Sequence, residues 1–566
     1  MRKITYSLGL DFGTNSVRAL ILNLVTGEET ASSVVTYQSG KEGVLTLSSD
    51  HHLARQNPRD YVHSLEKVVP EVLERAKKDR DFNSEGVIGI GVDTTGSTPL
   101  PVDKDCQPLS FQRRFDSNFE AQAWLWKDHT ASEEAQRITE LAREHRPQYL
   151  KKYGGAYSSE WFFSKIWHCL NIDPEVFYAA HSWLEFADYI PSFLAGIDDC
   201  QKVKRSICAA GHKAMYNDSW AGLPDKDFLS LLHPDMGSLR DRLFQRAYTS
   251  DIPAGTLSPY WAEKLGLPAG IPIAVGALDA HLGAVGSGVR EGVLVKIIGT
   301  STCDIMVFPI SKKFDDIPGV SGVAEGSVLP GYYGIEAGQS AVGDIFNWFV
   351  SKVCQGDSTI HRELSEKASL LRPGQSGLLA LDWNNGNRSI LVDAQLSGLL
   401  VGQTIHTTQE EIYRTLIEST AFGALVIIER IEEYGIKMEK VINCGGIAEK
   451  NPLAMQIYAD VLGRPMEISS SSETCALGAA IMGAVVAGEE KSGFATTEEV
   501  QEKVCRVKEE KYVPRQKEHE IYQNLYKLYR KLHDSFGVRD SRVDLYPVMK
   551  ELLKIRAETT HKDSKQ

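Results

Sequence analysis

The apolar and polar positions of the chain fall into short blocks that predict alternating strands and helices. The apolar runs Ser7–Leu10 and Val17–Leu22 flank a turn of sequence Asp-Phe-Gly-Thr, which predicts two antiparallel strands joined as a hairpin. Val293–Phe308 repeats this design around the turn Gly299–Thr302. A second copy of the same hairpin indicates that the chain contains two related halves.

The segments between and after the hairpins predict an α/β fold. Pro58–Ala76 has apolar residues at helical spacing, and Val87–Val92 is a buried-strand run that leads into a polar loop. Thr407–Tyr434 is the strongest helix, because two capping boxes precede its apolar face. Val441–Cys444 predicts a strand that meets a double glycine and then a helix.

The length of 566 residues predicts more than one domain. Residues 1–289 would hold the first hairpin and residues 290–492 the second. The sequence then becomes charged and helical, so residues 493–566 are expected to form a helical extension, with about ten disordered residues at its end. Two halves that face one nucleotide across a cleft resemble the two-domain, actin-like (ribonuclease H-like) ATPase fold.

The first hairpin is a candidate phosphate-binding turn. Gly13 lets the backbone approach a ligand, and the N–H and hydroxyl groups of Thr14, Asn15 and Ser16 can point into the turn. Asp11 would supply the carboxylate that a phosphate-bound magnesium ion needs. The alternative is an ordinary hairpin, since the same motif also closes β-hairpins without any ligand.

Asp279 is a candidate catalytic base. It lies where the predicted strand Ile273–Val275 gives way to a helix of small residues, with mainly apolar neighbours. An aspartate there could accept a proton from a substrate hydroxyl, or it could cap the helix, and the local sequence leaves both open. His281, two residues further on, is interpreted as structural.

Residues 105–260 are rich in aromatic side chains and less periodic than their flanks. Indoles beside hydrogen-bonding groups suit polyhydroxylated ligands, because rings cover C–H patches while polar groups bind hydroxyls. Most of these tryptophans are nevertheless expected in the core. Lys213 lies in a small-residue segment, where a lone lysine is usually solvated.

Composition narrows the function class. The net charge of −13 disfavours nonspecific binding to nucleic acid or to anionic membranes. No apolar run approaches the length of a membrane helix. The nine cysteines are odd in number and contain no C-x-x-C pair, which predicts reduced thiols instead of a zinc site or a disulfide framework. Together these features predict a cytoplasmic protein.

Taken in order, the motifs resemble the FGGY family of carbohydrate kinases, and within it the L-ribulokinase branch. The resemblance rests on GLDFGTNSVRAL (9–20), GVDTTGSTP (91–99), WKDHT (126–130), YSSEWFFSKI (157–166), AGHKAMY (210–216), GALDAHLGAVG (276–286), KIIGTSTCDI (296–305), IEAGQSAVGDI (335–345) and CGGIAEKN (444–451). The sequence departs from the family pattern in two places. The first family signature contains a Lys-x-x-Trp pair, whereas here Lys165 is followed by His168. The second signature, near Ala394–Glu418, has a longer spacer than usual.

The resemblance implies ATP-dependent phosphorylation of L-ribulose at its C5 hydroxyl, with ATP and Mg²⁺ as cofactors. Asp279 would be the catalytic base and Asp11 would help to hold magnesium. Gly96 falls where glycerol kinase has a substrate-binding arginine, so it should leave room for a longer sugar. The other implied residues are Trp126, Lys213 and Glu336 for the sugar, and Thr14, Asn15, Thr300, Gly343, Asn347 and Gly446 for ATP.

Several alternatives stay open from the sequence. The first is another kinase of the same family, acting on D-ribulose, xylulose or glycerol. The second is an actin-like ATPase switch without a sugar acceptor, which would leave Asp279 and the aromatic segment without a role. The third is a non-catalytic sugar-binding regulator. The expected partners are a small sugar and ATP, with neither nucleic acid nor membrane; a homodimer is one candidate assembly, which the sequence does not decide.

Overall fold

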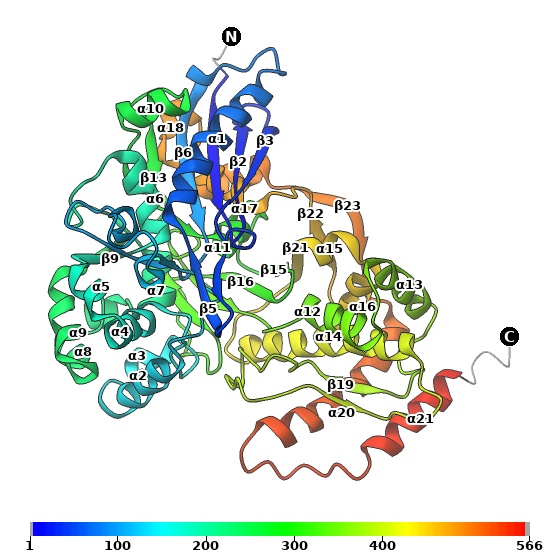
Figure 1. Ribbon diagram of the computed structural model, residues 1–566. Helices are drawn as coiled ribbons and strands as arrows, with labels where there is room; N and C mark the ends of the chain where they lie inside the picture. Colours follow the sequence, from blue (N-terminus) through cyan, green and yellow to red (C-terminus); the bar gives the residue numbers. More distant parts are fainter. Residues whose placement is uncertain (1–3, 561–566) are drawn as a thin grey trace.

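The first half of the chain is built on a seven-stranded sheet. The computed structural model describes residues 4–560 (Figure 1). Six strands run in the order β12-β13-β6-β1-β2-β3, and β14 also pairs with β6. Their bounds are β12 Pro253–Thr256, β13 Pro272–Ala274, β6 Val87–Thr94, β1 Tyr6–Phe12, β2 Ser16–Asn23, β3 Glu29–Thr36 and β14 Ala277–Leu278. The predicted first hairpin is confirmed, with Leu10 opposite Ala19 across the antiparallel pair.

The second half repeats this arrangement in another seven-stranded sheet, ordered β17-β18-β16-β15-β21-β22-β23. Its strands are β17 Gly322–Glu325, β18 Tyr332–Ala337, β16 Thr302–Pro309, β15 Val293–Ile298, β21 Lys440–Cys444, β22 Met466–Ser469 and β23 Val507–Tyr512. In both sheets an antiparallel hairpin lies beside a parallel strand: β1 pairs with β6, and β15 pairs with β21. The repeat predicted from the sequence is therefore a structural repeat.

Two helices of small residues lie between the sheets, α11 (Asp279–Gly286) and α17 (Thr474–Val486) (Figure 1). They approach so closely that a Cβ at Gly478 would lie 1.8 Å from the carbonyl oxygen of Leu282. A Cβ at Gly9 of β1 would likewise lie 1.9 Å from the carbonyl oxygen of Ala476. Glycine is needed at such contacts, and the close packing holds the start of α11 against the first sheet.

The aromatic segment forms its own core beside the first sheet. Its main helices are α2 (Ser132–His145), α4 (Phe162–Ile172) and α7 (Ile207–Lys213). Trp124 and Trp183 are fully buried in this core, whereas Trp126 is only half-buried. Most of these aromatic residues therefore serve packing, as expected.

The long predicted helix is confirmed as α14 (Gln409–Glu433). Of its two candidate capping boxes, the structure uses the one between Thr408 and Glu411. The hydroxyl of Thr407 instead accepts a hydrogen bond from the Thr404 N–H at 2.9 Å. α1 (Pro58–Ala76) also has its predicted bounds, and its buried face packs in the core of the first half.

The sequence predicts a helical C-terminal extension, but the structure also places a strand there. β23 extends the second sheet by pairing antiparallel with β22. Four of its six side chains are exposed, so this edge strand carries charges and lacks the alternation that would have marked it. Helices α20 (Gln516–Gly537) and α21 (Val548–Thr560) follow. The predicted disordered tail falls largely on residues 561–566, which lie outside the described residues.

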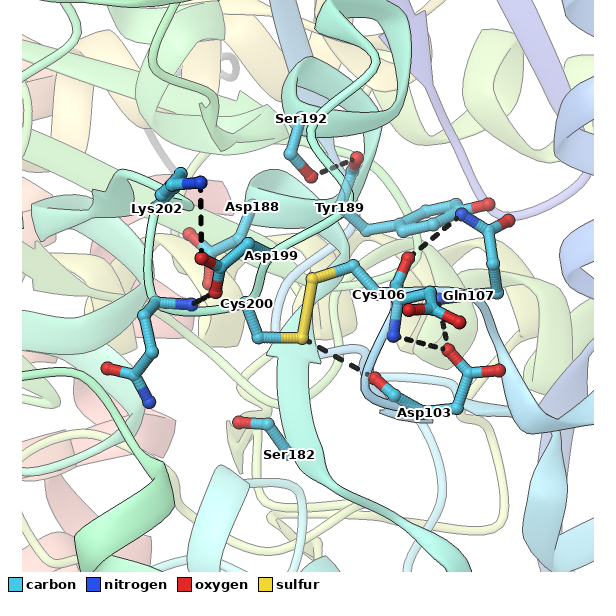
Figure 2. Close-up of a disulfide and its surroundings, with 12 residues drawn as sticks. Asp103, Cys106, Gln107, Ser182, Asp188, Tyr189, Ser192, Asp199, Cys200 and Lys202 are labelled. Carbon is cyan, nitrogen blue, oxygen red and sulfur yellow. Dashed lines mark hydrogen bonds and ion pairs between the residues drawn. A yellow bond between two sulfur atoms is a disulfide. The ribbon is translucent and has the colours of Figure 1, made fainter.

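One pair of cysteines differs from the prediction of reduced thiols. Figure 2 shows Cys106 and Cys200 joined by a disulfide, with their Cα atoms 5.5 Å apart. The two loops that carry them are 94 residues apart in the sequence, so no local spacing could reveal the pair. Between residues 4 and 560, no helix is both long enough and apolar enough to cross a membrane.

Candidate active site

Three carboxylates meet at the carboxyl ends of neighbouring parallel strands. Asp11 on β1 lies opposite Asp93 on β6, and Asp93 in turn lies opposite Ala277 on β14. Asp279 follows β14 directly as the first residue of α11. The carboxyl end of such a sheet is where α/β proteins place their ligands.

Asp279 has the properties of a proton acceptor. Leu278 occupies the cap position of α11, so the helix-cap alternative for Asp279 does not hold. Asp279 Oδ1 accepts a hydrogen bond from the Ala280 N–H at 2.7 Å. Burial, together with the charge of Asp11, raises the pKa of Asp279 to about 7. A carboxylate whose pKa is near neutrality can accept a proton and later release it.

Asp11 and Asp93 offer oxygens to a cation. Arg18 donates to Asp11 Oδ2 at 3.0 Å, which leaves the other oxygen free of that bond. Asp93 is fully buried, and neither of its oxygens has a hydrogen-bond partner among the described residues. Burial and the carboxylates of Asp11 and Asp279 raise its pKa well above 3.8. An unpartnered buried carboxylate beside a second one suits a divalent cation.

Asp93 was missed as a candidate, although its loop was noted in the sequence. The signal was the motif Asp93–Gly96 at the end of a buried strand. Its meaning depended on the parallel register of β6 with β1, which brings Asp93 beside Asp11. A single sequence does not reveal that register.

The tip of the first hairpin is linked to the aromatic segment. The Trp126 indole N–H donates to the Thr14 hydroxyl at 3.0 Å, so a predicted sugar residue contacts a predicted phosphate residue. Gln56 also donates to the Thr14 carbonyl oxygen at 2.7 Å. Asn15 is exposed, and its side chain donates to the carbonyl oxygen of Glu42. The Thr14 hydroxyl therefore faces Trp126, whereas the Asn15 side chain is bonded to the loop that contains Glu42.

The second hairpin meets the helices predicted to hold adenosine. The carbonyl oxygen of Thr300 accepts from the Val342 N–H at 2.7 Å, just before Gly343 begins α12 (Gly343–Trp348). A Cβ on Gly343 would lie 3.4 Å from the Ile447 side chain, next to Gly446. Three of the predicted ATP residues are therefore neighbours. Asn347 lies one turn further along α12 and is exposed.

Lys213 and Glu336 form a buried ion pair. Lys213 Nζ lies 3.0 Å from both carboxylate oxygens of Glu336. Lys213 is therefore paired inside the protein, whereas a lone lysine is usually solvated. His212 and His281 flank the same carboxylate. Burial lowers the pKa of His281 to about 4 and that of His212 well below 6.5, which favours the neutral form of both rings.

A second buried lysine, Lys165, links the loop that contains Ser97 to the segment Trp124–Leu125. Its Nζ donates to the carbonyl oxygens of Ser97 at 2.8 Å, Leu125 at 2.9 Å and Trp124 at 3.2 Å. Glu185 accepts from the Thr98 N–H at 2.8 Å on the same loop. This network fixes the segments that follow Gly96 and precede Trp126.

Gly96 is constrained by packing. A Cβ at this position would lie 2.3 Å from Leu278 Cδ2, the residue that precedes Asp279. The absence of a side chain therefore lets the loop rest against the start of α11. Room for a longer sugar stays a prediction for this glycine.

Comparison with known proteins identifies the family. The model of the N-terminal domain of the FGGY family of carbohydrate kinases matches residues 6–286, and that of the C-terminal domain matches residues 294–487. The chain belongs to the FGGY family of carbohydrate kinases. The resemblance drawn from the motifs is thereby confirmed, and the chain is a carbohydrate kinase.

Relatives within the family align over nearly the whole chain. The ribulokinase of Shouchella clausii is 40% identical over 567 residues, covering 98% of each chain. That of Halalkalibacterium halodurans is 41% identical over 551 residues, covering 94% of this chain and 95% of its own.

Solved structures confirm the FGGY fold. A gluconate kinase from Lactobacillus acidophilus has a TM-score of 0.77 at 17% identity, covering 95% of this chain and 99% of its own. The xylulose kinase of Rhodospirillum rubrum has a TM-score of 0.75 at 20% identity, covering 94% and 98%. The predicted two-domain, actin-like α/β fold is therefore correct.

Proposed function

We propose that this protein transfers the γ-phosphoryl group of ATP to the C5 hydroxyl of L-ribulose. The observation that carries the proposal is the identity of 40–41% to two ribulokinases across almost the entire chain. Relatives that share only the fold, such as the xylulose kinase, are far less similar in sequence.

In the proposed reaction, Asp279 accepts the proton of the C5 hydroxyl as its oxygen bonds to the γ-phosphorus. The bond from that phosphorus to the bridging oxygen breaks, and ADP leaves with the electron pair. The raised pKa of Asp279 suits this role, because the carboxyl can take a proton at neutral pH. Lys213 and Glu336 would bind the remaining hydroxyls, with Trp126 against the sugar's C–H face and Gly96 leaving room for its length.

Asp11 and Asp93 would hold the magnesium ion of MgATP. When bound, that ion would neutralise charge on the phosphates and orient them for in-line transfer. The turn around Thr14 and Asn15 and the turn around Thr300 would contact the phosphates through N–H and hydroxyl groups. Burial of the unpartnered Asp93 oxygens supports a cation at this position.

The adenosine of ATP would lie on the second half, against Gly343, Asn347 and Gly446. Residues 1–289 would then supply the acceptor site and the base, and residues 290–492 the nucleotide site, with residues 493–566 as an extension. Because the reaction consumes ATP, we place the protein in the cytoplasm.

The test is ADP release measured with L-ribulose, D-ribulose, L-xylulose, D-xylulose, glycerol and no sugar. We expect the highest kcat/KM with L-ribulose and little ADP without sugar. Preference for another sugar would move the protein to another branch of the family. ADP release that does not depend on sugar would instead favour the ATPase alternative.

Asp279→Asn should abolish the sugar-dependent rate, by about 10³-fold or more, because the amide cannot accept the proton. The matched control is Asp227→Asn, which removes an exposed carboxylate on α8 (Lys226–Leu232). That variant should retain the native rate. Retention of most activity by Asp279→Asn would exclude this residue as the base.

A further inference from the structure

Two buried imidazoles direct unpartnered nitrogens at one carboxylate oxygen. His212 Nδ1 lies 3.5 Å from Glu336 Oε2, and His281 Nε2 lies 3.6 Å from the same oxygen. His212 and His281 are 0% and 1% exposed. Within residues 4–560, neither of these two nitrogens has a hydrogen-bond partner.

The hydrogen bonds of His212 determine which of its nitrogens carries the proton. Its Nε2 lies 2.9 Å from the Ser327 hydroxyl, and that hydroxyl donates to the Ala324 carbonyl oxygen at 3.0 Å. Since the hydroxyl proton is already used, Nε2 must be the donor and Nδ1 must carry the lone pair. A neutral lone pair then faces the Glu336 carboxylate with no proton between them.

Such an arrangement is unfavourable unless a cation lies between the atoms. The Lys213 ammonium bonds to both oxygens of Glu336 but, among the described residues, has no hydrogen bond to either histidine. It can keep Oε1 if another cation takes Oε2.

The spacing of the three atoms fits a small metal ion. The nitrogens of His212 and His281 and the oxygen of Glu336 all lie within 4.8 Å of one another. Tetrahedral bonds of about 2.0–2.1 Å place neighbouring ligand atoms about 3.4 Å apart. The two separations from Glu336 Oε2, 3.5 and 3.6 Å, are close to that value. A water with tetrahedral hydrogen bonds of about 2.8 Å would instead place its partners about 4.6 Å apart.

We propose that His212, His281 and Glu336 form a binding site for a transition-metal ion of the Zn²⁺ type. Two neutral imidazoles and one carboxylate are the donor set that zinc prefers, with a fourth position left for water. This site is separate from the cation position at Asp11 and Asp93, which offers oxygens suited to magnesium.

The ion would regulate the enzyme. If Lys213 and Glu336 bind the acceptor, as the proposed function has it, then Zn²⁺ on Glu336 competes with the sugar. We therefore expect zinc to inhibit the kinase competitively against the sugar and not against ATP.

Binding is tested on the full chain without sugar or nucleotide. Metal-free protein is titrated with ZnCl₂ by calorimetry, and we expect one saturable site that His212→Asn and His281→Asn each weaken at least tenfold. His52→Asn, at an exposed histidine, is the control and should bind like the native chain. Cys475→Ser should also leave the titration unchanged, which separates this site from the group formed by Asp11, Asp93 and Cys475.

A spectroscopic measurement on the native chain needs no variant. Co²⁺ in place of zinc should give the intense visible absorption of tetrahedral coordination, and ZnCl₂ should remove it. A titration without a saturable site, a site that both histidine variants leave intact, or a weak octahedral Co²⁺ spectrum would each overturn the proposal. Zinc that binds here without affecting the sugar KM would instead contradict the acceptor role of Lys213 and Glu336.

Discussion

Replacing Asp279 by asparagine should stabilise the fold while it removes activity. The side chain is half-buried beside Asp11, and its pKa rises from 3.8 to about 7. Above pH 7 the folded protein must therefore hold a charge that the unfolded chain solvates freely. Asparagine has nearly the same size, and its amide oxygen can still accept from the Ala280 N–H.

The magnitude follows from the pKa shift. A rise of roughly 3 units, at about 1.36 kcal/mol per unit, sets an upper bound of about 4 kcal/mol on the cost of ionised Asp279. Because the carboxyl is partly exposed, solvent screening reduces this, and we expect a gain of about 1–3 kcal/mol for Asp279→Asn. The chain has 566 residues, and at about 2.1 cal/mol/K per residue its unfolding entropy is about 1.2 kcal/mol/K, so the gain corresponds to a rise of about 1–3 °C in Tm.

The gain must depend on pH in one direction. Below about pH 4 the carboxyl is protonated in both folded and unfolded states, so the variant gains nothing there. The gain grows as pH rises from about 4 to about 7 and is then constant. The assay is differential scanning fluorimetry of native and variant protein from pH 4 to pH 8.5, with Asp227→Asn as the exposed control. A Tm difference that is negative, or equal at pH 4.5 and pH 8, would refute the reasoning.

Three further outcomes follow from the same site. The kcat/KM for the sugar should fall as pH decreases through about 7, because protonated Asp279 cannot act as a base. A kcat/KM that does not change between pH 5 and pH 9 would contradict this. Lys165→Met should raise the sugar KM about tenfold or more and leave the ATP KM within twofold, because three buried carbonyl oxygens around the acceptor lose their donor. The control Lys151→Met, at an exposed lysine, should change neither KM. Gly96→Ala should lower stability by about 1–3 kcal/mol in urea unfolding. If the clash with Leu278 is the cause, the same substitution should cost less when it is made in a Leu278→Ala variant than in the native chain.

The periodic parts of the fold could be predicted from the sequence because they depend on local patterns. Both hairpins, α1 and α14 are defined by apolar spacing and capping residues that lie within each element. β23 could not be predicted, since an edge strand that exposes its charges has no apolar alternation. The Cys106–Cys200 pair depends on two distant loops and leaves no local signal.

The candidate site could be predicted in part for the same reason. Asp11, Thr14 and Asp279 lie in short motifs whose position at strand ends is visible in the sequence. Asp93 and Lys165 act through partners on other segments, so their importance appears only once β6 lies beside β1 and α4 reaches the Ser97 loop. His281 was interpreted as structural, and only the folded chain brings it to Glu336.

The most direct test of the central claim is the structure of the product formed from L-ribulose and ATP. L-Ribulose has primary hydroxyls at C1 and C5, and phosphorus–proton couplings in NMR spectra show which one carries the phosphate. We predict a single product phosphorylated at C5, formed by the native chain and absent with Asp279→Asn. Phosphate at C1, or product formation by Asp279→Asn at a rate near the native one, would contradict the proposed acceptor geometry and its base.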